Sequence, residues 1–535
     1  MSAALAGTGG LVRLALRRDR ILLPLWVLLI AVLPMTYAST FAGLYPSQAE
    51  RAGYVAGTAG NPSIVALLGP IYGDSVGALA VQRSGMLLLI VALISLLTVI
   101  RHTRTEEEAG RRELLGATAL GRHAGLTAAL LLTYAADLLL GLLAAAGLVT
   151  VDLPVAGALA FGAALTVAGW VFASIGGLAA QLTTGAGSAR GIGLAVLGLA
   201  FVLRLAGDAA EAGGGSGWLS WLSPLGWVER VRAFADERWW VLLPGLALTA
   251  LAAAVAYPIS ARRDLGAGIL PPRSGPAVAA PWLASPLALA WRLHRGLLLG
   301  WAVGATALGA ILGSVADAAG RAVGDNPQLA EIMARLGGTA ALSDAYLAGV
   351  MTIVGLAIAG YGVQAALRTR VEETAGRAEP VLAGAVGRTR WLAGHLLLAV
   401  AGPVVALAVG GVATGLTYGL ATGDVSGQVP RLLGAALVQV PAVWVLTGLA
   451  VLLFGALPRA AGASWAALAG CFLLGQLGAV LELGQWALDL SPFTHIPRLP
   501  GGEVTVLPLL MLTVVAGVFA GAGVVAFRRR DVPVT

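Results

Sequence analysis

Lysine is absent from this 535-residue sequence, in which all 34 basic residues are arginine. A phosphate-binding loop of the form GxxxxGK[ST] needs its lysine to reach the phosphates of a nucleotide. The sequence therefore predicts that this chain does not itself bind or hydrolyse ATP.

Cysteine and histidine are scarce as well. The single cysteine, Cys471, lies in an apolar run and has no partner for a disulfide within the chain. The five histidines, at positions 102, 123, 294, 395 and 495, lack the spacing typical of metal ligands. A membrane-embedded enzyme would need clustered acids or histidines on one face, and the sequence has no such cluster. We therefore expect no metal, no cofactor and no catalytic residue on this chain.

Charged residues make up only 11% of the chain, far below the roughly 25% typical of soluble domains, and 58% of the residues are hydrophobic. The 74 glycines suit helices that approach one another closely in lipid. Because a membrane-spanning helix needs about 20 apolar residues, the sequence predicts an all-α integral membrane protein with about twelve spans. These lie near 21–43, 80–100, 124–147, 154–182, 191–206, 239–259, 296–316, 345–367, 391–419, 431–456, 463–481 and 506–527.

One charged motif occurs twice between these apolar runs. TRTEEEAGRRELLGATALGR at residues 103–122 matches TRVEETAGRAEPVLAGAVGR at 369–388, with twelve of the twenty aligned residues identical. Three other features repeat in step. WLSWLSP at 218–224 matches WALDLSP at 486–492, basic amphipathic segments precede the first span of each half, and Arg-Arg-Asp ends each half at 262–264 and 529–531.

These repeats predict two parallel halves of six spans each, because an even number of spans returns the chain to the same side of the membrane. The first half is residues 1–264, a Pro- and Gly-rich linker covers 265–286, and the second half is 287–535. Arginine outnumbers acidic residues in the loops on one side only, so the positive-inside rule places both termini and both motif copies in the cytoplasm.

The motif acids recur in register, although acids contribute little to membrane topology. Glutamates 106 and 113 would share one face of a helix with Gly110, and Glu107 and Arg111 are spaced for an i,i+4 ion pair. Two interpretations are open: a solvated loop that sets topology, or an exposed docking surface for a cytoplasmic partner with two-fold symmetry. We favour docking, through Glu106, Glu107, Gly110, Arg111, Glu113, Glu372, Glu373, Gly376, Arg377 and Glu379.

Two further sets of residues are candidates. The paired segments before the last span of each half contain Trp218, Ser223 and Pro224, and Trp486, Ser491 and Pro492. Asp137 lies well inside the third predicted span, where a charge is costly, so it either packs with hydrogen bonds or serves a proton or substrate pathway.

The order of these features resembles that of ABC type-2 permeases. The EExAGRxE loop and LSPFTHIPRLPGG at 490–502 resemble, more narrowly, the fused actinobacterial exporters of the tetronasin or polyketide-antibiotic group. This resemblance implies a cell-membrane exporter of amphipathic drug-like molecules, with each motif a coupling helix for one of two copies of a separate ATPase. ATP and Mg²⁺ would bind to that ATPase, and the paired Trp-to-Pro segments would form short helices at the outer mouth. Pro380 departs from the first copy, which has Leu114, so the resemblance implies a shorter or bent second coupling helix.

The alternative is a twelve-span ion-coupled secondary transporter, which can also have parallel six-span halves. Such a carrier should concentrate ionisable residues at mid-membrane. Only Asp137 is clearly placed there by the sequence, so the exporter remains the preferred interpretation.

Overall fold

The computed structural model describes residues 3–59, 62–116, 118–264, 266–270, 276–324, 338–477 and 484–531. Within these residues all regular secondary structure is helical, and eleven helical segments are long and apolar enough to cross a membrane. The prediction of an all-α integral membrane protein is therefore confirmed. The span expected at 463–481 corresponds to α21 (Ala463–Leu477), a shorter helix after which the description stops until residue 484, so the count of twelve stays a prediction.

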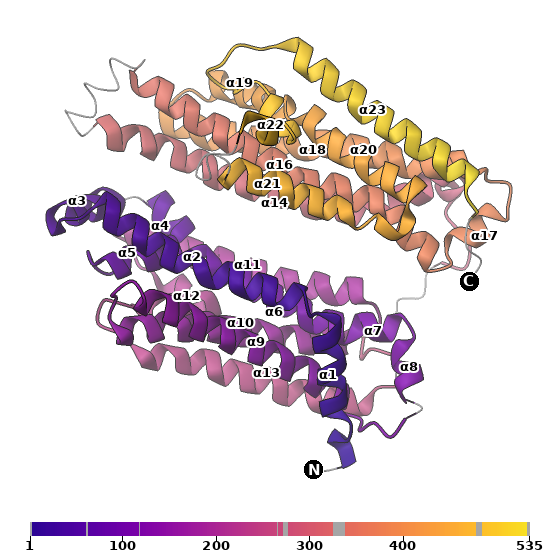
Figure 1. The fold of residues 1–535 in the computed structure, drawn as a ribbon, viewed down its shortest axis with the longest axis horizontal. Helices are drawn as coiled ribbons and strands as arrows, with labels where there is room; N and C mark the ends of the chain where they lie inside the picture. Colours follow the sequence, from indigo (N-terminus) through magenta and orange to yellow (C-terminus); the bar gives the residue numbers. More distant parts are fainter. Residues whose placement is uncertain are drawn as a thin grey trace. The chain divides into compact units, whose positions relative to one another are not determined.

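The helices form two compact units, Met1–Gly275 and Pro276–Thr535, which divide inside the stretch expected to be a linker. Unit 1 contains the helices coloured indigo to pink in Figure 1. Its apolar spans are α2 (Leu22–Leu44), α6 (Gly85–His102), α9 (Ala124–Val149), α10 (Val155–Leu182), α11 (Ala186–Ala212) and α13 (Leu243–Arg262). Its shorter helices are α1 (Thr8–Arg18), α3 (Gln48–Ala59), α4 (Pro62–Leu68), α5 (Val76–Arg83), α7 (Arg104–Glu108), α8 (Arg111–Gly116), η2 (Trp218–Leu222), α12 (Pro224–Glu229) and η3 (Trp239–Leu242).

Unit 2 repeats this order, and its helices α14, α16 and α18 are longer than their counterparts in unit 1. Its long apolar helices are α14 (Pro286–Gly324), α16 (Gly338–Thr374), α18 (Arg388–Thr422), α20 (Val440–Ala456) and α23 (Val506–Arg529). Between them lie α17 (Ala378–Leu382), α19 (Val425–Leu437), α21, α22 (Gln485–Leu488) and η6 (Pro492–His495). In unit 1 a break at Asp19 separates α1 from α2, whereas in unit 2 the corresponding basic segment and span form the single helix α14.

Equivalent helices pack against each other in the two units. In unit 1, α2 packs on α9, α6 on α10, and α10 on α13; in unit 2, α14 packs on α18, α16 on α20, and α20 on α23. Each unit has its own apolar core, built around α10 in one and around α16 and α20 in the other. The repeat in the sequence is thus also a repeat in helix packing.

Glycine permits the closest of these approaches. A Cβ added to Gly141 of α9 would collide with the carbonyl oxygen of Gly162 in α10, and a Cβ on Gly162 would collide with that of Gly141. In unit 2, Gly455 of α20 and Gly523 of α23 leave no room for a Cβ in the same way. The expectation that glycine serves close helix contact in lipid is confirmed at these positions.

Candidate functional site

In both units the charged motif forms an elbow of two helices. In unit 1, α7 ends at Glu108, and Gly110 has φ 69° before α8 begins. In unit 2, α16 ends at Thr374, and Gly376 has φ 68° before α17 begins. This left-handed conformation is strained for residues with a Cβ, which explains a glycine at both positions. The prediction that Glu106, Gly110 and Glu113 share one helical face is therefore wrong, since the helix is interrupted at Gly110.

The first glutamate of each motif binds the arginine five positions later. In unit 1, Arg111 Nε donates to Glu106 Oε2 at 2.6 Å, and in unit 2 Arg377 Nε donates to Glu372 Oε2 at 2.7 Å. Hydrogen bonding to Glu106 raises the pKa of Arg111. The expected i,i+4 pairs of Glu107 with Arg111 and of Glu373 with Arg377 are not formed, because the glycine bend rotates each arginine toward the preceding glutamate.

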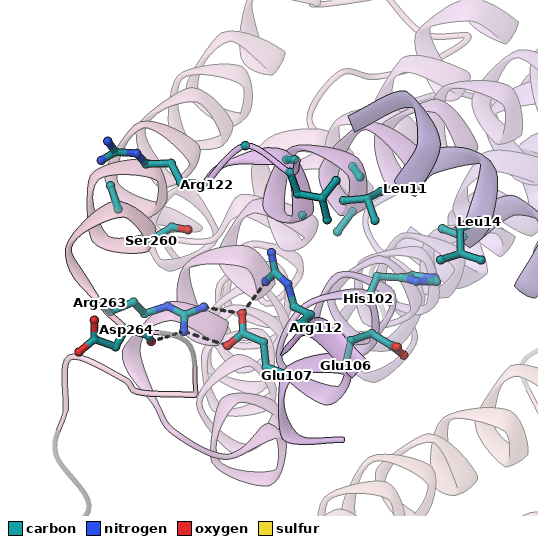
Figure 2. Close-up of a pocket in the computed structure, with 18 of the residues that line it drawn as sticks. Leu11, Leu14, His102, Glu106, Glu107, Arg112, Arg122, Ser260, Arg263 and Asp264 are labelled. Carbon is teal, nitrogen blue, oxygen red and sulfur yellow. Dashed lines mark hydrogen bonds and ion pairs between the residues drawn. The ribbon is translucent and has the colours of Figure 1, made fainter. Parts of the chain in front are cut away.

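The second glutamate of each motif is buried and is held by the end of the last helix of its own unit. Arg263, directly after α13, donates to both oxygens of Glu107 at 2.7 and 2.8 Å (Figure 2). Arg530, directly after α23, donates to both oxygens of Glu373 at 2.6 Å. Each motif is thereby clamped to the helix that closes its unit. We call each of these carboxylate–guanidinium pairs a closing clamp.

The clamps correct the expectation that these acids form an exposed docking surface. The exposed fraction of the side chain is 15% for Glu106, 1% for Glu107, 7% for Glu372 and 5% for Glu373. Losing one partner of a buried ion pair typically costs about 3–5 kcal/mol, because the other charge is left uncompensated. The carboxylates of these four glutamates are therefore occupied by arginines of their own unit, and Glu106 is the most exposed of the four.

The last acid of each motif has a different environment. Glu113 on α8 and Glu379 on α17 are exposed, and within the described residues neither forms a side-chain ion pair. Arg111 and Arg377 beside them also expose about half of their side chains, 48% and 52%. Pro380 lies in the first turn of α17, where its missing N–H is not needed by the helix, so α17 forms despite this departure.

The unit 1 elbow also lines a cavity of about 360 Å³. Its walls come from α1, from the end of α6, from α7 and α8, and from the ends of α9 and α13 (Figure 2). Glu107 receives two further ion pairs here, from Arg104 at 2.8 Å and from Arg112 at 2.5 Å, and Arg18 of α1 pairs with Glu106. Ala378 occupies the position of Arg112 in unit 2 and is buried, so the two elbows are alike in their clamps and different in their surroundings.

The paired Trp-to-Pro segments start short helices in both units. Ser223 caps α12 by accepting hydrogen bonds from two backbone N–H groups, with Pro224 in the first turn. Ser491 precedes η6, which begins with Pro492. Both serines are buried, whereas Trp218 and Trp486 are exposed. The short helices agree in form with those implied by the resemblance.

Asp137 lies fully buried where α6, α9 and α10 meet. Ser95 Oγ of α6 donates to its Oδ1 at 2.7 Å, whereas its Oδ2 has no partner within the described residues. Gly169 of α10 leaves room for the carboxyl group. The structure thus places Asp137 in a helix interface and brings it together with none of the motif residues.

Comparison with known proteins gives two matches. The family described as "Multidrug efflux system permease Rv1217c, C-terminal domain" matches residues 283–528. The chain is also 47% identical over 527 residues to the multidrug efflux system permease protein Rv1217c of Mycobacterium tuberculosis (strain ATCC 25618 / H37Rv), an alignment that covers 98% of this chain and 95% of that protein.

Proposed function

This chain belongs to the family of the multidrug efflux system permease Rv1217c, and on that premise we propose that it is the membrane-spanning subunit of an ATP-driven exporter of amphipathic drug-like molecules. Energy comes from a separate ATPase that holds the ATP and Mg²⁺. Polyketide-type antibiotics are the substrate class implied by the narrower resemblance.

The observation that carries this proposal is the duplication of the closing clamp. A separate ATPase can move the transmembrane helices only through a contact element that is rigid. Each elbow is bent by a glycine, braced by its first glutamate, and tied by its second glutamate to the last helix of the unit. A force on either elbow would therefore be passed to the last helix of its own unit.

Two elbows in one chain suit two copies of the ATPase. The groups available for contact are the exposed Glu113 and Glu379, with the half-exposed Arg111 and Arg377 beside them. In this proposal both elbows and both chain termini face the cytoplasm. We thus propose that docking uses the last glutamate of each motif in place of the first two.

The stoichiometry can be tested by native mass spectrometry of the complex purified through a tag on this chain. We expect one copy of this chain with two ATPase subunits. A complex with two copies of this chain would contradict the proposal that one chain supplies both docking sites.

The docking residues can be tested with the double variant Glu113→Gln plus Glu379→Gln. Because both side chains are exposed, thermal stability should change by no more than about 0.5 kcal/mol. ATPase co-purification and efflux of the amphipathic dye ethidium should both fall several-fold. The matched control is Glu503→Gln, which removes an exposed carboxylate elsewhere in unit 2. Full ATPase association and full efflux in the double variant would exclude these acids from docking.

A further inference from the structure

Unit 1 contains a second cavity, of about 520 Å³, at the end where α12 lies and away from α7 and α8 (Figure 1). The loop after α11, the helix η2 and the segment that follows α12 supply most of its walls. Its charged wall residues are Glu211, Arg230, Arg232 and Arg238. Arginine therefore dominates this cavity.

The three arginines differ in how far they are neutralised. Arg230 Nη2 donates to Glu211 at 2.6 Å, and its Nη1 lies 3.3 Å from Asp208. Arg238 is 3.9 Å from the largely exposed Asp236, a weak contact. Arg232 forms no ion pair and no side-chain hydrogen bond with any residue the structure describes, and its Nε is buried without a partner.

Arg232 is instead packed against an aromatic ring. Its guanidinium carbon lies 4.7 Å from the centroid of the Tyr72 ring. The Tyr72 hydroxyl is also buried without a hydrogen-bond partner in the described part of the chain, and burial raises its pKa, so it stays a hydroxyl donor. A buried polar group left unsatisfied costs about 1–3 kcal/mol. Arg232 Nε and the Tyr72 hydroxyl are two such donors on one cavity wall, and a hydrogen-bond acceptor bound in the cavity would satisfy both.

The backbone that presents Arg232 is strained and firmly held. Arg232, Phe234 and Asp236 have φ values of 54°, 65° and 60°, each costing on the order of 1–3 kcal/mol in a residue with a Cβ. The Phe234 ring fits against Gly77 of α5 and Gly157 of α10, where a Cβ would collide with it. Such strain persists only where the surroundings fix it, and it gathers at binding sites.

The cavity also offers flat apolar surface. Trp218 and Trp221 line it and are 59% and 41% exposed, and Trp221 stacks on Trp240 at an interplanar angle of 12°. Tryptophan rings of this kind suit the boundary between membrane and water. Arg232 itself has no equivalent in unit 2, because the register that aligns Trp218 with Trp486 places Pro500 opposite Arg232.

We propose that this cavity binds the head group of an anionic amphiphile. The carboxylate, phosphate or sulfonate accepts hydrogen bonds from Arg232 and Tyr72, Arg238 adds positive charge, and the apolar body lies against Trp218 and Trp221. A membrane phospholipid and an exported anionic compound share this chemistry. The site is independent of how the protein is energised, and it lies within unit 1.

Isothermal titration of the full chain in phosphatidylcholine nanodiscs tests the site with three probes. These are 2-naphthalenesulfonate, its uncharged analogue 2-naphthalenesulfonamide, and dioctanoyl phosphatidylglycerol. We expect at least one anionic probe to bind, and the uncharged analogue to bind at least tenfold more weakly than the sulfonate where the sulfonate binds. Arg232→Gln should weaken anion binding by about 10- to 100-fold, in keeping with the loss of a charge-assisted hydrogen bond.

Two further variants separate binding from folding. Tyr72→Phe keeps the ring under Arg232 and should weaken anion binding several-fold without lowering thermal stability, because it removes only an unpartnered hydroxyl. Arg17→Gln removes an exposed arginine from α1 and should bind anions like the wild type. Binding of phosphatidylglycerol alone would assign the site to lipid, binding of the sulfonate alone would assign it to a transported compound, and mutual competition would assign both. Equal affinity of wild type and Arg232→Gln for every anion, or equal affinity for the sulfonate and the sulfonamide, would overturn the proposal.

Discussion

Glu373 and Arg530 form a bidentate ion pair, in which Arg530 Nη1 donates to Glu373 Oε1 and Arg530 Nη2 donates to Glu373 Oε2, each at 2.6 Å. The side chains are 5% and 16% exposed, and Arg530 also lies 5.0 Å from the ring centroids of Phe454 and Phe527. The pair thus joins the motif, the fourth span and the last helix of unit 2. Its counterpart in unit 1 is the pair of Glu107 with Arg263.

We predict that Glu373→Gln destabilises the protein by about 3 kcal/mol, since Arg530 keeps its charge and its aromatic neighbours while losing its counter-ion. The checking measurement is thermal unfolding in detergent of Glu373→Gln, Arg530→Gln and the double variant. The double variant should be less destabilised than the sum of the single variants by at least about 1 kcal/mol, as expected for residues in contact. Strict additivity would show that the two residues do not interact.

The unit 1 clamp provides the comparison. Glu107 forms ion pairs with Arg104, Arg112 and Arg263 at once, so Glu107→Gln removes the one carboxylate that these three arginines share. It should therefore lower the unfolding temperature more than Glu373→Gln does. A smaller effect at Glu107 would mean that water in the adjoining cavity screens these charges.

Local patterns in the sequence account for much of this architecture. The length of the apolar segments predicted the long helices, and the repeated motifs predicted the two halves. Both features can be read from contiguous residues. The link from Glu107 to Arg263 joins residues far apart in the chain and depends on how α13 packs, so neither motif alone predicts it. The sequence did offer one indication of this link, because both the charged motif and the Arg-Arg-Asp that ends each half are duplicated. Gly110 and Gly376 likewise indicated a helix end in each motif, and a glycine in the left-handed conformation interrupts the helix even where the acids on either side are spaced as on one helical face.

Residues outside the duplicated motifs could not be identified from the sequence in this way. Arg232, Tyr72 and Phe234 lie in different segments of unit 1, and their meeting depends on the turn after α12. The sequence also ended the fifth span near residue 206, whereas α11 continues to Ala212 and includes Asp208. Arg204 forms ion pairs with both Asp208 and Glu229 at the end of the helix, which makes the added turns possible in an apolar segment.

Asp137→Asn distinguishes the ATP-driven exporter from an ion-coupled carrier. The side-chain amide oxygen of asparagine can accept the hydrogen bond from Ser95, so folding should be unchanged. In the exporter this residue packs between helices, and efflux of ethidium should stay within about twofold of wild type at pH 6 and pH 8. Loss of efflux with normal membrane insertion would instead favour a proton pathway through Asp137.

Gly162→Ala tests the close approach of α9 and α10. The added methyl group would meet the carbonyl of Gly141, and overpacking of this kind typically costs about 1–3 kcal/mol. Gly198→Ala in α11 is the matched control, because nothing lies within 4 Å of its added Cβ. We expect a lower unfolding temperature for the first variant only. Equal unfolding temperatures for the two variants would show that α9 and α10 can move apart without loss of stability.

Glu229 should make the stability of the protein depend on pH. Burial raises its pKa from 4.5 to about 8, even though Arg204 donates to it at 2.5 Å. The charges around it support this direction, because the linked cluster contains three acids, Asp208, Glu211 and Glu229, and only two arginines, Arg204 and Arg230. Glu211 is half exposed, whereas Asp208 is buried beside Glu229 and opposes its ionisation, which adds to the effect of burial.

Between pH 4.5 and 8 the folded chain then holds a proton on Glu229 that the unfolded chain has released. Stability should therefore fall as pH rises through this window, by at most about 1.4 kcal/mol per pH unit, and level off above pH 8. Glu229→Gln is neutral at every pH and should lack this decline. The measurement is the unfolding temperature from pH 5 to 9 for wild type, Glu229→Gln and the exposed control Asp236→Asn, which should follow the wild type. Parallel curves for all three proteins would show that Glu229 is ionised throughout, with Arg204 outweighing the effect of burial.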